Sequence, residues 1–471
     1  MQRRTFLAAL ASTAAGAFAQ SLPHATSSQT VTIHLDPSRT ISPIPENFIG
    51  LGYEISSVST PGLLSAANDP YVQLVRTLGT KGVIRIGGNT SDYASFQPNG
   101  EAVSAPKASV ITEANLRELG TFLQATGWQL IWGLNLGNKS EQEAAAEAVA
   151  VSAIAGDKLL AFEIGNEPDL FSHEGHRPAG YSYEKYLAEY RRYKQAIRAK
   201  LPNATFAGPD AADHTDWVTR FAQDEGSDLK LLTHHYYREG QSPFSTLDKL
   251  LNPDPHLKTL LAKLQQASGT AHLPYRICET NSFSGGGRPG VSDTFGAALW
   301  VLDYLFTLAS FNAAGVNIET GVNQHDFISS YSPIGDDRHG NYTAKAAYYG
   351  MLAFAQAAQG ERLALDYDPS GINLSAYATA HSGRAALTLI NKDRSQSANV
   401  RLTTAASHRK AGILRLTAPS LESKGEIRLG KTAVAPNGSW RPEANETAKL
   451  SNGEHVLQIP AGSAAIVFLE A

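Results

Sequence analysis

The strongest constraint on the fold of this chain is an alternation of strand and helix patterns that repeats eight times between residues 47 and 358. Each strand candidate is short, rich in β-forming residues and followed by glycine or polar residues. The eight candidates are 48–54, 82–86, 129–134, 161–165, 205–208, 231–236, 275–278 and 316–319. This alternation is typical of a parallel sheet, and eight such units predict an α/β fold closed into a (β/α)8 TIM barrel.

The segments between these strands have the spacing of amphipathic helices. In the clearest one, apolar side chains share one stripe opposite arginine and lysine: Tyr183, Tyr186, Leu187, Tyr190, Tyr193 and Ile197. Comparable patterns cover 113–125, 141–154, 257–266, 294–310 and 344–358. An open, doubly wound sheet is the competing fold, but the dinucleotide-binding fingerprint that would favour it is absent from the sequence.

A second domain is expected after the barrel. Beyond Gly360 the pattern changes to short alternating strands, at 372–376, 385–390, 411–416 and 464–469, which predicts an accessory β-sandwich over 359–471. Residues 30–35 alternate in the same way, so we expect the segment 20–46 to add a strand to that domain. Two domains also agree with a length of 471 residues, which exceeds what one hydrophobic core usually organises.

Residues 1–19 have the pattern of an export signal. Arg3 and Arg4 precede a small, weakly apolar run that ends in an A-x-A cleavage site at residues 17–19. The paired arginines favour a bacterial twin-arginine signal, with an ordinary secretory signal as the alternative. We therefore expect a periplasmic or secreted protein. Elsewhere no run of about 18 apolar residues predicts a membrane span.

The composition excludes several kinds of partner. A formal net charge of −4 provides no basic surface for nucleic acid, because phosphate binding needs clustered lysine and arginine. Cys278 is the single cysteine, so no internal disulfide can form in spite of the expected export. The sequence gives no reason to expect a metal or organic cofactor, and we expect a monomer.

Two predicted barrel strands end in a glutamate. The fourth is followed by Asn166, Glu167 and Pro168, and the seventh by Glu279. Active sites of (β/α)8 barrels form at these strand ends, and glycoside hydrolysis needs two carboxyl groups that flank the scissile bond. A lone glutamate could simply cap a helix, but two on opposite sides of one barrel mouth favour catalysis. Glu163, deeper in the fourth strand, is expected to be structural.

The sixth predicted strand ends with His234, His235, Tyr236 and Tyr237. Adjacent side chains of a strand point to opposite faces, so the two histidines do not readily share a metal ion. His234 and Tyr236 share a face. If that face is the inner one, Tyr236 can donate a hydrogen bond to Glu279 and keep it ionised.

Two further features flank the seventh strand. By the same alternation, Cys278 is expected to point away from Glu279, into the layer between strands and helices. The glycine-rich loop at 284–288 lacks the Gly-Lys-Ser/Thr that completes a phosphate-binding loop. Consecutive glycines can instead direct backbone N–H groups at a carboxylate, and a loop without a ligand is the alternative.

These segments resemble, in the same order, those of glycoside hydrolase family 79, the β-glucuronidases and heparanases, within the clan of (β/α)8 retaining glycosidases. The matching residues are 162–168 (FEIGNEP), 234–237 (HHYY), 279–282 (ETNS), the glycines 285–287, and 292–295 (SDTF). The Asn-Glu pair marks only the clan, whereas the last three segments are specific to the family. The resemblance covers the barrel and the flanking β-domain.

The resemblance implies a retaining double displacement on glucuronides. Glu279 would attack the anomeric carbon, while Glu167 would protonate the leaving oxygen and later activate water. Asn166 would hold the 2-hydroxyl of the sugar. Glu54 and Asn89 match positions that bind other sugar hydroxyls.

The family binds the uronic carboxylate largely through backbone N–H groups of the glycine-rich loop and through tyrosine hydroxyls. Ser284, Gly285 and Gly286 fall on these loop positions, with Ser284 in place of the family's usual tyrosine. Tyr331 is aligned with a second tyrosine after the eighth strand. His325 is a further candidate contact for the carboxylate.

The resulting hypothesis is an exo-β-glucuronidase that acts on oligosaccharides or glycosides containing glucuronic acid. No pronounced cluster of lysine and arginine suggests a groove for a sulfated chain, as an endo-acting heparanase-like enzyme would need. Another retaining glycosidase of the clan, such as a β-xylosidase or β-glucosidase, is a second alternative that the glycine-rich loop disfavours. A non-catalytic carbohydrate-binding protein is a third, disfavoured by the presence of both glutamates.

Overall fold

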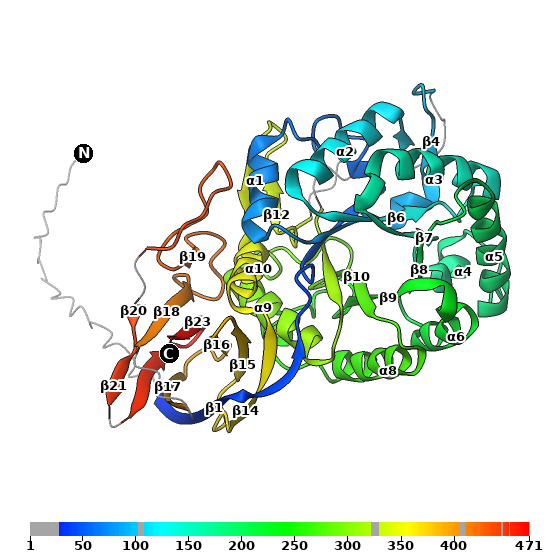
Figure 1. Cartoon of the computed structure of the whole chain (residues 1–471). Coiled ribbons are helices and arrows are strands. Elements are labelled where there is room, and N and C mark those ends of the chain that lie inside the picture. The colour runs from blue at the N-terminus through cyan, green and yellow to red at the C-terminus, as the bar shows by residue number, and fades with distance from the viewer. Residues whose placement is uncertain are drawn as a thin grey trace, which may run out of the picture.

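The computed structural model describes residues 28–101, 108–321, 329–404, 410–443, 446–451 and 453–470 of the chain. Figure 1 shows two parts, a parallel barrel surrounded by helices and a curled, mostly antiparallel sheet beside it. The fold class predicted from the sequence is therefore confirmed. The expected export signal, residues 1–19, lies outside the described residues.

Eight parallel strands close the barrel in the order β10, β11, β2, β3, β6, β7, β8, β9, so neighbours around the barrel are neighbours along the chain. Each strand overlaps one of the eight predicted from the sequence. Their bounds are β2 Gly50–Glu54, β3 Val83–Gly87, β6 Gln129–Leu134, β7 Leu159–Ile164, β8 Phe206–Ala211, β9 Leu229–Tyr237, β10 Tyr275–Asn281 and β11 Gly315–Glu319.

Helices cover the outside of the barrel and pack apolar side chains against it. The longer ones are α1 Asp69–Leu78, α2 Glu113–Thr126, α3 Glu141–Ala155, α5 Tyr183–Lys200, α6 Thr215–Glu225, α8 Pro255–Ala271, α9 Phe295–Ser310 and α10 Ala346–Ala357. Short turns complete the connections: η1 Ile55–Ser57, η2 Asn89–Tyr93, η3 Gly156–Lys158, η4 Pro168–Leu170, α4 Phe171–Glu174, η5 Gly226–Asp228 and α7 Leu247–Leu251. None of the described helices combines the length and apolar character that a membrane span requires.

The strands separate an outer apolar layer, against the helices, from a small layer inside the barrel. The inner layer contains Val83, Ile131, Ala161, Ala207, Leu231 and Cys278. The expected position of Cys278, between strands and helices, was therefore wrong. The pairing of β10 with β9 shifts register between Ile277 and Glu279, as in a β-bulge, so Cys278 and Glu279 both face the barrel interior.

The second part is a single curled sheet of eleven strands. Ten follow the order β19, β18, β23, β16, β15, β14, β1, β17, β22, β21, and β20 pairs with β18. The strands are β1 Ser28–Pro43, β14 Glu361–Tyr367, β15 Leu374–His381, β16 Arg384–Asn391, β17 Ser397–Thr404, β18 Lys410–Thr417, β19 Arg428–Leu429, β20 Glu446–Thr447, β21 Lys449–Ser451, β22 Glu454–Ile459 and β23 Ser463–Glu470. Strand β1 lies between β14 and β17, so the N-terminal segment joins the C-terminal sheet as expected.

Helices α9 and α10 lie between the barrel and the sheet (Figure 1). Both are apolar around most of their circumference, because one face packs on the barrel and the other on the sheet. Asp303 of α9 accepts hydrogen bonds from Lys392 and Tyr377 of the sheet. Two small ribbons lie outside both parts: β4 Ser95–Phe96 with β5 Val110–Ile111, and β12 Ile334–Asp336 with β13 Tyr342–Ala344.

Candidate active site

Glu167 and Glu279 meet at the mouth formed by the C-terminal ends of the barrel strands. Their side chains are 12% and 9% exposed. A carboxylate oxygen of one lies within 4.8 Å of a carboxylate oxygen of the other. Glu167 has a φ of 50°, and Pro168 begins η4 directly after it, so a sharp turn presents the carboxyl group to the barrel mouth. The structure thus brings together the two glutamates that the sequence analysis singled out.

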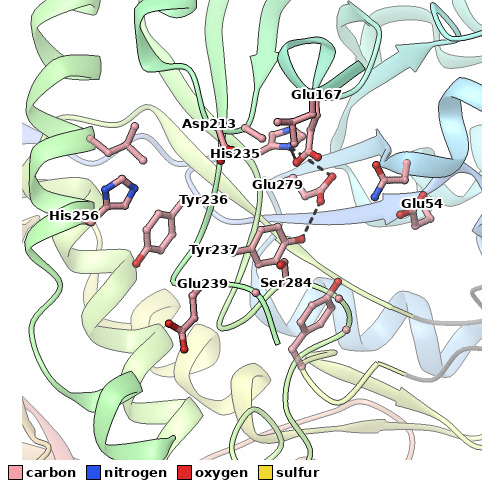
Figure 2. A pocket seen from close by; sticks show the side chains of 18 residues that line it. Glu54, Glu167, Asp213, His235, Tyr236, Tyr237, Glu239, His256, Glu279 and Ser284 are labelled. Atoms are coloured by element: carbon pink, nitrogen blue, oxygen red, sulfur yellow. Dashed lines mark hydrogen bonds and ion pairs between the residues drawn. The ribbon is translucent and has the colours of Figure 1, made fainter. Parts of the chain in front are cut away.

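A cavity of about 630 Å³ opens above these glutamates (Figure 2). Nine residues singled out from the sequence line it: Glu54, Asn89, Glu167, Tyr236, Glu279, Ser284, Gly285, Gly286 and Tyr331. Asn166 is buried beside the cavity and is not part of its wall. His325 falls in 322–328, outside the described residues.

The buried guanidinium of Arg85, on β3, donates a hydrogen bond to Glu279, the candidate nucleophile. Its Nη1 donates to Oε2 of Glu279 at 2.8 Å, and its Nε donates to Glu163 at 3.1 Å. The Nη2 group donates to Asn166 at 2.8 Å and also to Asp210. All five side chains are buried. Each nitrogen of the guanidinium donates to a carboxylate or amide oxygen, and a buried charge requires such partners.

His235, on β9, joins this arrangement to the second glutamate. Its Nε2 lies 2.8 Å from Oδ1 of Asp210, and its Nδ1 lies 2.8 Å from Oε1 of Glu167. Because both partners are carboxyl oxygens, the assignment that satisfies them is an imidazolium with a proton on each nitrogen. Arg85, Asp210 and His235 form what we call the buried charge network, which contacts both Glu167 and Glu279.

Within the network, the pKa of His235 is raised and the pKa of Asp210 is lowered. Burial lowers the pKa of His235, but the charges of Asp210 and Glu279 raise it well above its ordinary value. Burial raises the pKa of Asp210, yet the cations of Arg85 and His235 hold it at about 2. For Glu167, burial raises the pKa, the contact with His235 lowers it and the charge of Glu279 raises it, with a net rise.

The hydroxyl of Tyr237 donates to Oε1 of Glu279 at 2.9 Å, so both oxygens of that carboxylate are engaged. The sequence analysis gave this contact to Tyr236, on the condition that its face of the strand is the inner one. Strand β9 instead turns His235 and Tyr237 inward. The hydroxyl of Tyr236 donates to Asp254 and its ring packs against α9. The prediction for Tyr236 was therefore wrong, although the residue still borders the cavity.

Glu54 and Asn89 form one side of the cavity. Glu54 ends β2 and accepts hydrogen bonds from the backbone N–H and the hydroxyl of Thr90, at 2.7 and 2.5 Å. Burial, together with the charge of Glu279, raises the pKa of Glu54 to about 7. Asn166 lies behind Asn89 and donates to its side-chain oxygen at 3.3 Å.

The glycine-rich loop also lines the cavity. Its three glycines, 285–287, have φ values of 72°, 84° and 79°, a left-handed region that strongly favours glycine. The N–H of Ser284 donates to the carbonyl of Glu239, and the carbonyl of Gly286 accepts from the N–H of Tyr331. Within the described part of the chain, no acceptor engages the N–H of Gly285 or Gly286. These two donors are therefore available to a ligand in the cavity.

The sequence analysis assigned no role to Arg85, Asp210, His235 or Tyr237. Arg85 did leave a signal, because a charge inside an apolar strand must find buried partners. Asp210 left none, since the strand predicted at 205–208 ended before it. The roles of His235 and Tyr237 depend on which face of β9 points inward, which alternation alone does not decide.

Two groups of possible metal ligands have their ligand atoms within 4.8 Å of one another: Glu163, Asp210 and Cys278, and Glu167, His235 and Glu279. In the first group, Arg85 already donates to both carboxylates. In the second, His235 donates to one carboxylate and faces the other at 3.9 Å. A metal ion would have to displace these side-chain cations, so the geometry favours a pair of catalytic carboxyl groups.

Sequence comparison finds β-glucuronidases and heparanases among the similar proteins. The β-glucuronidase of Aspergillus niger is 30% identical over 370 residues, which cover 69% of this chain and 67% of that protein. The β-glucuronidase of Neurospora crassa is 28% identical over 374 residues, and mouse heparanase is 24% identical over 356 residues. The matched stretch spans about two thirds of each of these relatives. No family model matches the chain.

Comparison of structures supports the fold. A 4-O-α-L-rhamnosyl-β-D-glucuronidase from Fusarium oxysporum superposes with a TM-score of 0.75 and 20% identity over 93% of this chain and 99% of its own. An α-L-arabinofuranosidase from Thermotoga maritima superposes with a TM-score of 0.69 and 13% identity, over 94% of this chain and 100% of its own. At these identities the likeness shows a shared architecture and leaves the substrate open.

Proposed function

The chain belongs to glycoside hydrolase family 79, the family of the β-glucuronidases and heparanases, and from this premise we propose that it is a retaining exo-β-glucuronidase. Its substrate would be a β-linked terminal glucuronic acid on an oligosaccharide or other glycoside. The observation that carries the proposal is the pair of Glu167 and Glu279, set between the charge network and a glycine loop with free N–H groups.

The spacing of the two carboxyl groups supports the retaining mechanism. Retaining enzymes hold them about 5 to 5.5 Å apart, whereas inverting enzymes leave about 6.5 to 9.5 Å for a water molecule. Here one oxygen of Glu167 lies within 4.8 Å of one oxygen of Glu279, and this closest approach is compatible with the shorter separation. In the first step Glu279 bonds to the anomeric carbon as the glycosidic bond breaks, and the leaving oxygen takes the proton of Glu167. In the second step Glu167 deprotonates the water that displaces Glu279.

The different surroundings of the two glutamates support these roles. Glu279 accepts from the Arg85 cation and from the Tyr237 hydroxyl, and both contacts favour its ionised, nucleophilic form. The pKa of Glu167 is raised chiefly by burial, which favours the protonated form that a general acid needs. One environment thus suits a nucleophile and the other a proton donor.

Neutral donors would bind the uronic carboxylate. Gly285, Gly286, Tyr331 and Ser284 line the cavity, and the N–H groups of Gly285 and Gly286 have no acceptor among the described residues. Backbone N–H groups that converge in a left-handed turn form an anion site without a lysine or arginine. On the other side of the sugar, Glu54 and Asn89 would bind hydroxyl groups. The second amide hydrogen of Asn166 would reach the 2-hydroxyl.

The exo-acting assignment is supported by the charge of the cavity. None of the described residues that line it is lysine or arginine, whereas a sulfated polysaccharide needs such cations along its path. An endo-acting, heparanase-like enzyme and a glucosidase or xylosidase of the same clan are the competing outcomes of the following experiment.

We expect purified protein to hydrolyse 4-nitrophenyl β-D-glucuronide and to act on the glucoside and xyloside at least about 100-fold more slowly. Glu279→Gln should abolish turnover. Glu167→Gln should lower kcat by roughly 10²- to 10⁴-fold, because hydrolysis of the glycosyl-enzyme loses its general base, whereas kcat/KM should fall less, since 4-nitrophenolate leaves with little need of protonation. Steady-state absorbance assays check both. Faster cleavage of the glucoside would contradict the assigned carboxylate site, and cleavage only within long uronate chains would show endo action.

Tyr237→Phe should lower kcat/KM for the glucuronide by about 10- to 100-fold, because a hydrogen bond to a charged group contributes roughly 1.5 to 3 kcal/mol. Tyr236→Phe is the matched control, since its hydroxyl contacts Asp254 instead of Glu279. We expect the control to change kcat/KM less than about threefold. Kinetics on variants with verified melting temperatures decide, and a larger loss for Tyr236→Phe would contradict the observed orientation of β9.

Asp210→Asn should move the alkaline limb of the kcat/KM profile to higher pH. Without the charge of Asp210, the pKa of His235 falls and its imidazolium is lost; the contact that lowers the pKa of Glu167 then disappears. Glu167 therefore keeps its proton to higher pH. Glu163→Gln is the control, because it also removes a carboxylate from Arg85 but leaves the contact between His235 and Asp210 intact. Equal profiles for wild type and Asp210→Asn would argue against the coupling.

A further inference from the structure

The cavity extends past the catalytic pair on the side away from Glu54 (Figure 2). Figure 2 shows Asp213, Tyr236 and His256 on this side, with Glu54 on the other. If the glucuronyl unit occupies the side with Glu54 and the glycine loop, as the proposed function requires, the leaving group must occupy the side with Asp213. We call this second end the aglycone end.

The described wall of the aglycone end contains carboxylates and one histidine, His256, and no lysine or arginine. Leu170 and Leu260 supply apolar surface, and Asp213 and Glu239 supply carboxylates. Glu239 is already compensated, because Lys249 binds its Oε2 at 2.5 Å and Ser245 donates to its Oε1 at 3.1 Å.

A nearby cation does not neutralise the remaining carboxylate. Arg238 follows the inward-facing end of β9, but its guanidinium donates to the backbone carbonyl of Asn252 at 2.9 Å and faces Asp254 at 3.9 Å. Asp213 is exposed, and its carboxylate has no hydrogen-bond or ion-pair partner among the described residues. It is therefore the uncompensated charge of the aglycone end.

The position of Asp213 relative to the proton donor is fixed by its backbone. The N–H groups of Ala212, Asp213 and His214 all donate to the carboxylate of Asp169, at 3.0, 2.9 and 2.9 Å. Asp169 is buried and lies two residues after Glu167. The loop that carries Asp213 is thus attached to the same turn that carries the proton donor, which holds the backbone of Asp213 at this end of the cavity.

We propose that the aglycone end selects leaving groups that are neutral or positively charged, such as amino sugars, and that Asp213 disfavours those carrying a sulfate or carboxylate next to the scissile bond. A carboxylate in a binding site repels an anionic ligand and attracts a cationic one, so it lowers the affinity for the first and raises it for the second. One exposed pair of opposite charges strengthens binding by about severalfold, and one pair of like charges weakens it by a similar factor. Together they predict a preference of roughly tenfold for cationic over anionic aglycones.

A set of three 4-nitrophenyl β-D-glucuronides tests this proposal, bearing an aminomethyl, a hydroxymethyl or a carboxylate group at the same ring position. The quantity to compare is kcat/KM, because it includes the step in which the aglycone leaves. Wild type should prefer the aminomethyl over the carboxylate substrate by about tenfold, and the ratio should shrink at high salt. Asp213→Asn should bring the ratio within about twofold, and Asp213→Lys should invert it.

Asp216→Asn is the matched control, since it removes the same charge three residues away, outside the cavity wall. It should leave the ratio as in wild type. Equal rates on all three substrates, or a preference that survives Asp213→Asn, would overturn the role of Asp213 while leaving the glucuronidase assignment intact. Hydrolysis of none of the three would overturn the proposed function, and the assignment of the aglycone end with it.

Discussion

The site depends on one buried cation, the guanidinium of Arg85. Removing a guanidinium from water is costly, and it is tolerated only where carboxylates and other acceptors surround it. Arg85 has such acceptors from three other strands or strand ends, including Asp210 and Glu279. Because Asp210 also binds His235, the same ion pairs fix the imidazole that contacts Glu167. The positions of both candidate catalytic groups therefore follow from a single electrostatic requirement.

In the proposed mechanism, the network would give the two glutamates of this cavity opposite tasks. Two carboxyl groups this close disfavour simultaneous ionisation, so one tends to keep a proton. Arg85 and Tyr237 both donate to the carboxylate of Glu279. Glu167 is left with burial and a single cationic contact, and its pKa is raised. Pairs of groups whose environments separate their proton affinities are the usual mark of an acid and a nucleophile.

The sequence predicted the barrel well because its signals are local. Each strand combined β-forming residues with a polar end, so all eight strands were found. Six of the outer helices followed from their apolar spacing, whereas α1 and α6 were not predicted. Glu167 and Glu279 followed from their places at strand ends. The orientation of side chains near Glu279 was not predictable, because the bulge at Cys278 changes the alternation by one residue. Asp210 and its partners come together only when distant strands close the barrel.

The fold alone does not choose the substrate, since the same barrel carries glycosidases of different specificity. Substrate choice must come from the loops at the barrel mouth. In this chain the glycine loop offers N–H donors on one side, and the loop with Asp213 offers a negative charge on the other. The glycine loop accepts a backbone hydrogen bond from Tyr331, and the backbone N–H of Asp213 donates to the side chain of Asp169, two residues after Glu167, so both loops are held at the barrel mouth.

The most direct test of the central claim is neutron diffraction from deuterium-exchanged crystals near neutral pD, which locates the protons of the network. The account predicts deuterium on both ring nitrogens of His235 and on the carboxyl group of Glu167, and none on Asp210 or Glu279. A His235 ring with one bare nitrogen, or deuterium on Glu279, would contradict the claim that the network of Arg85, Asp210 and His235 sets the two glutamates to opposite protonation states.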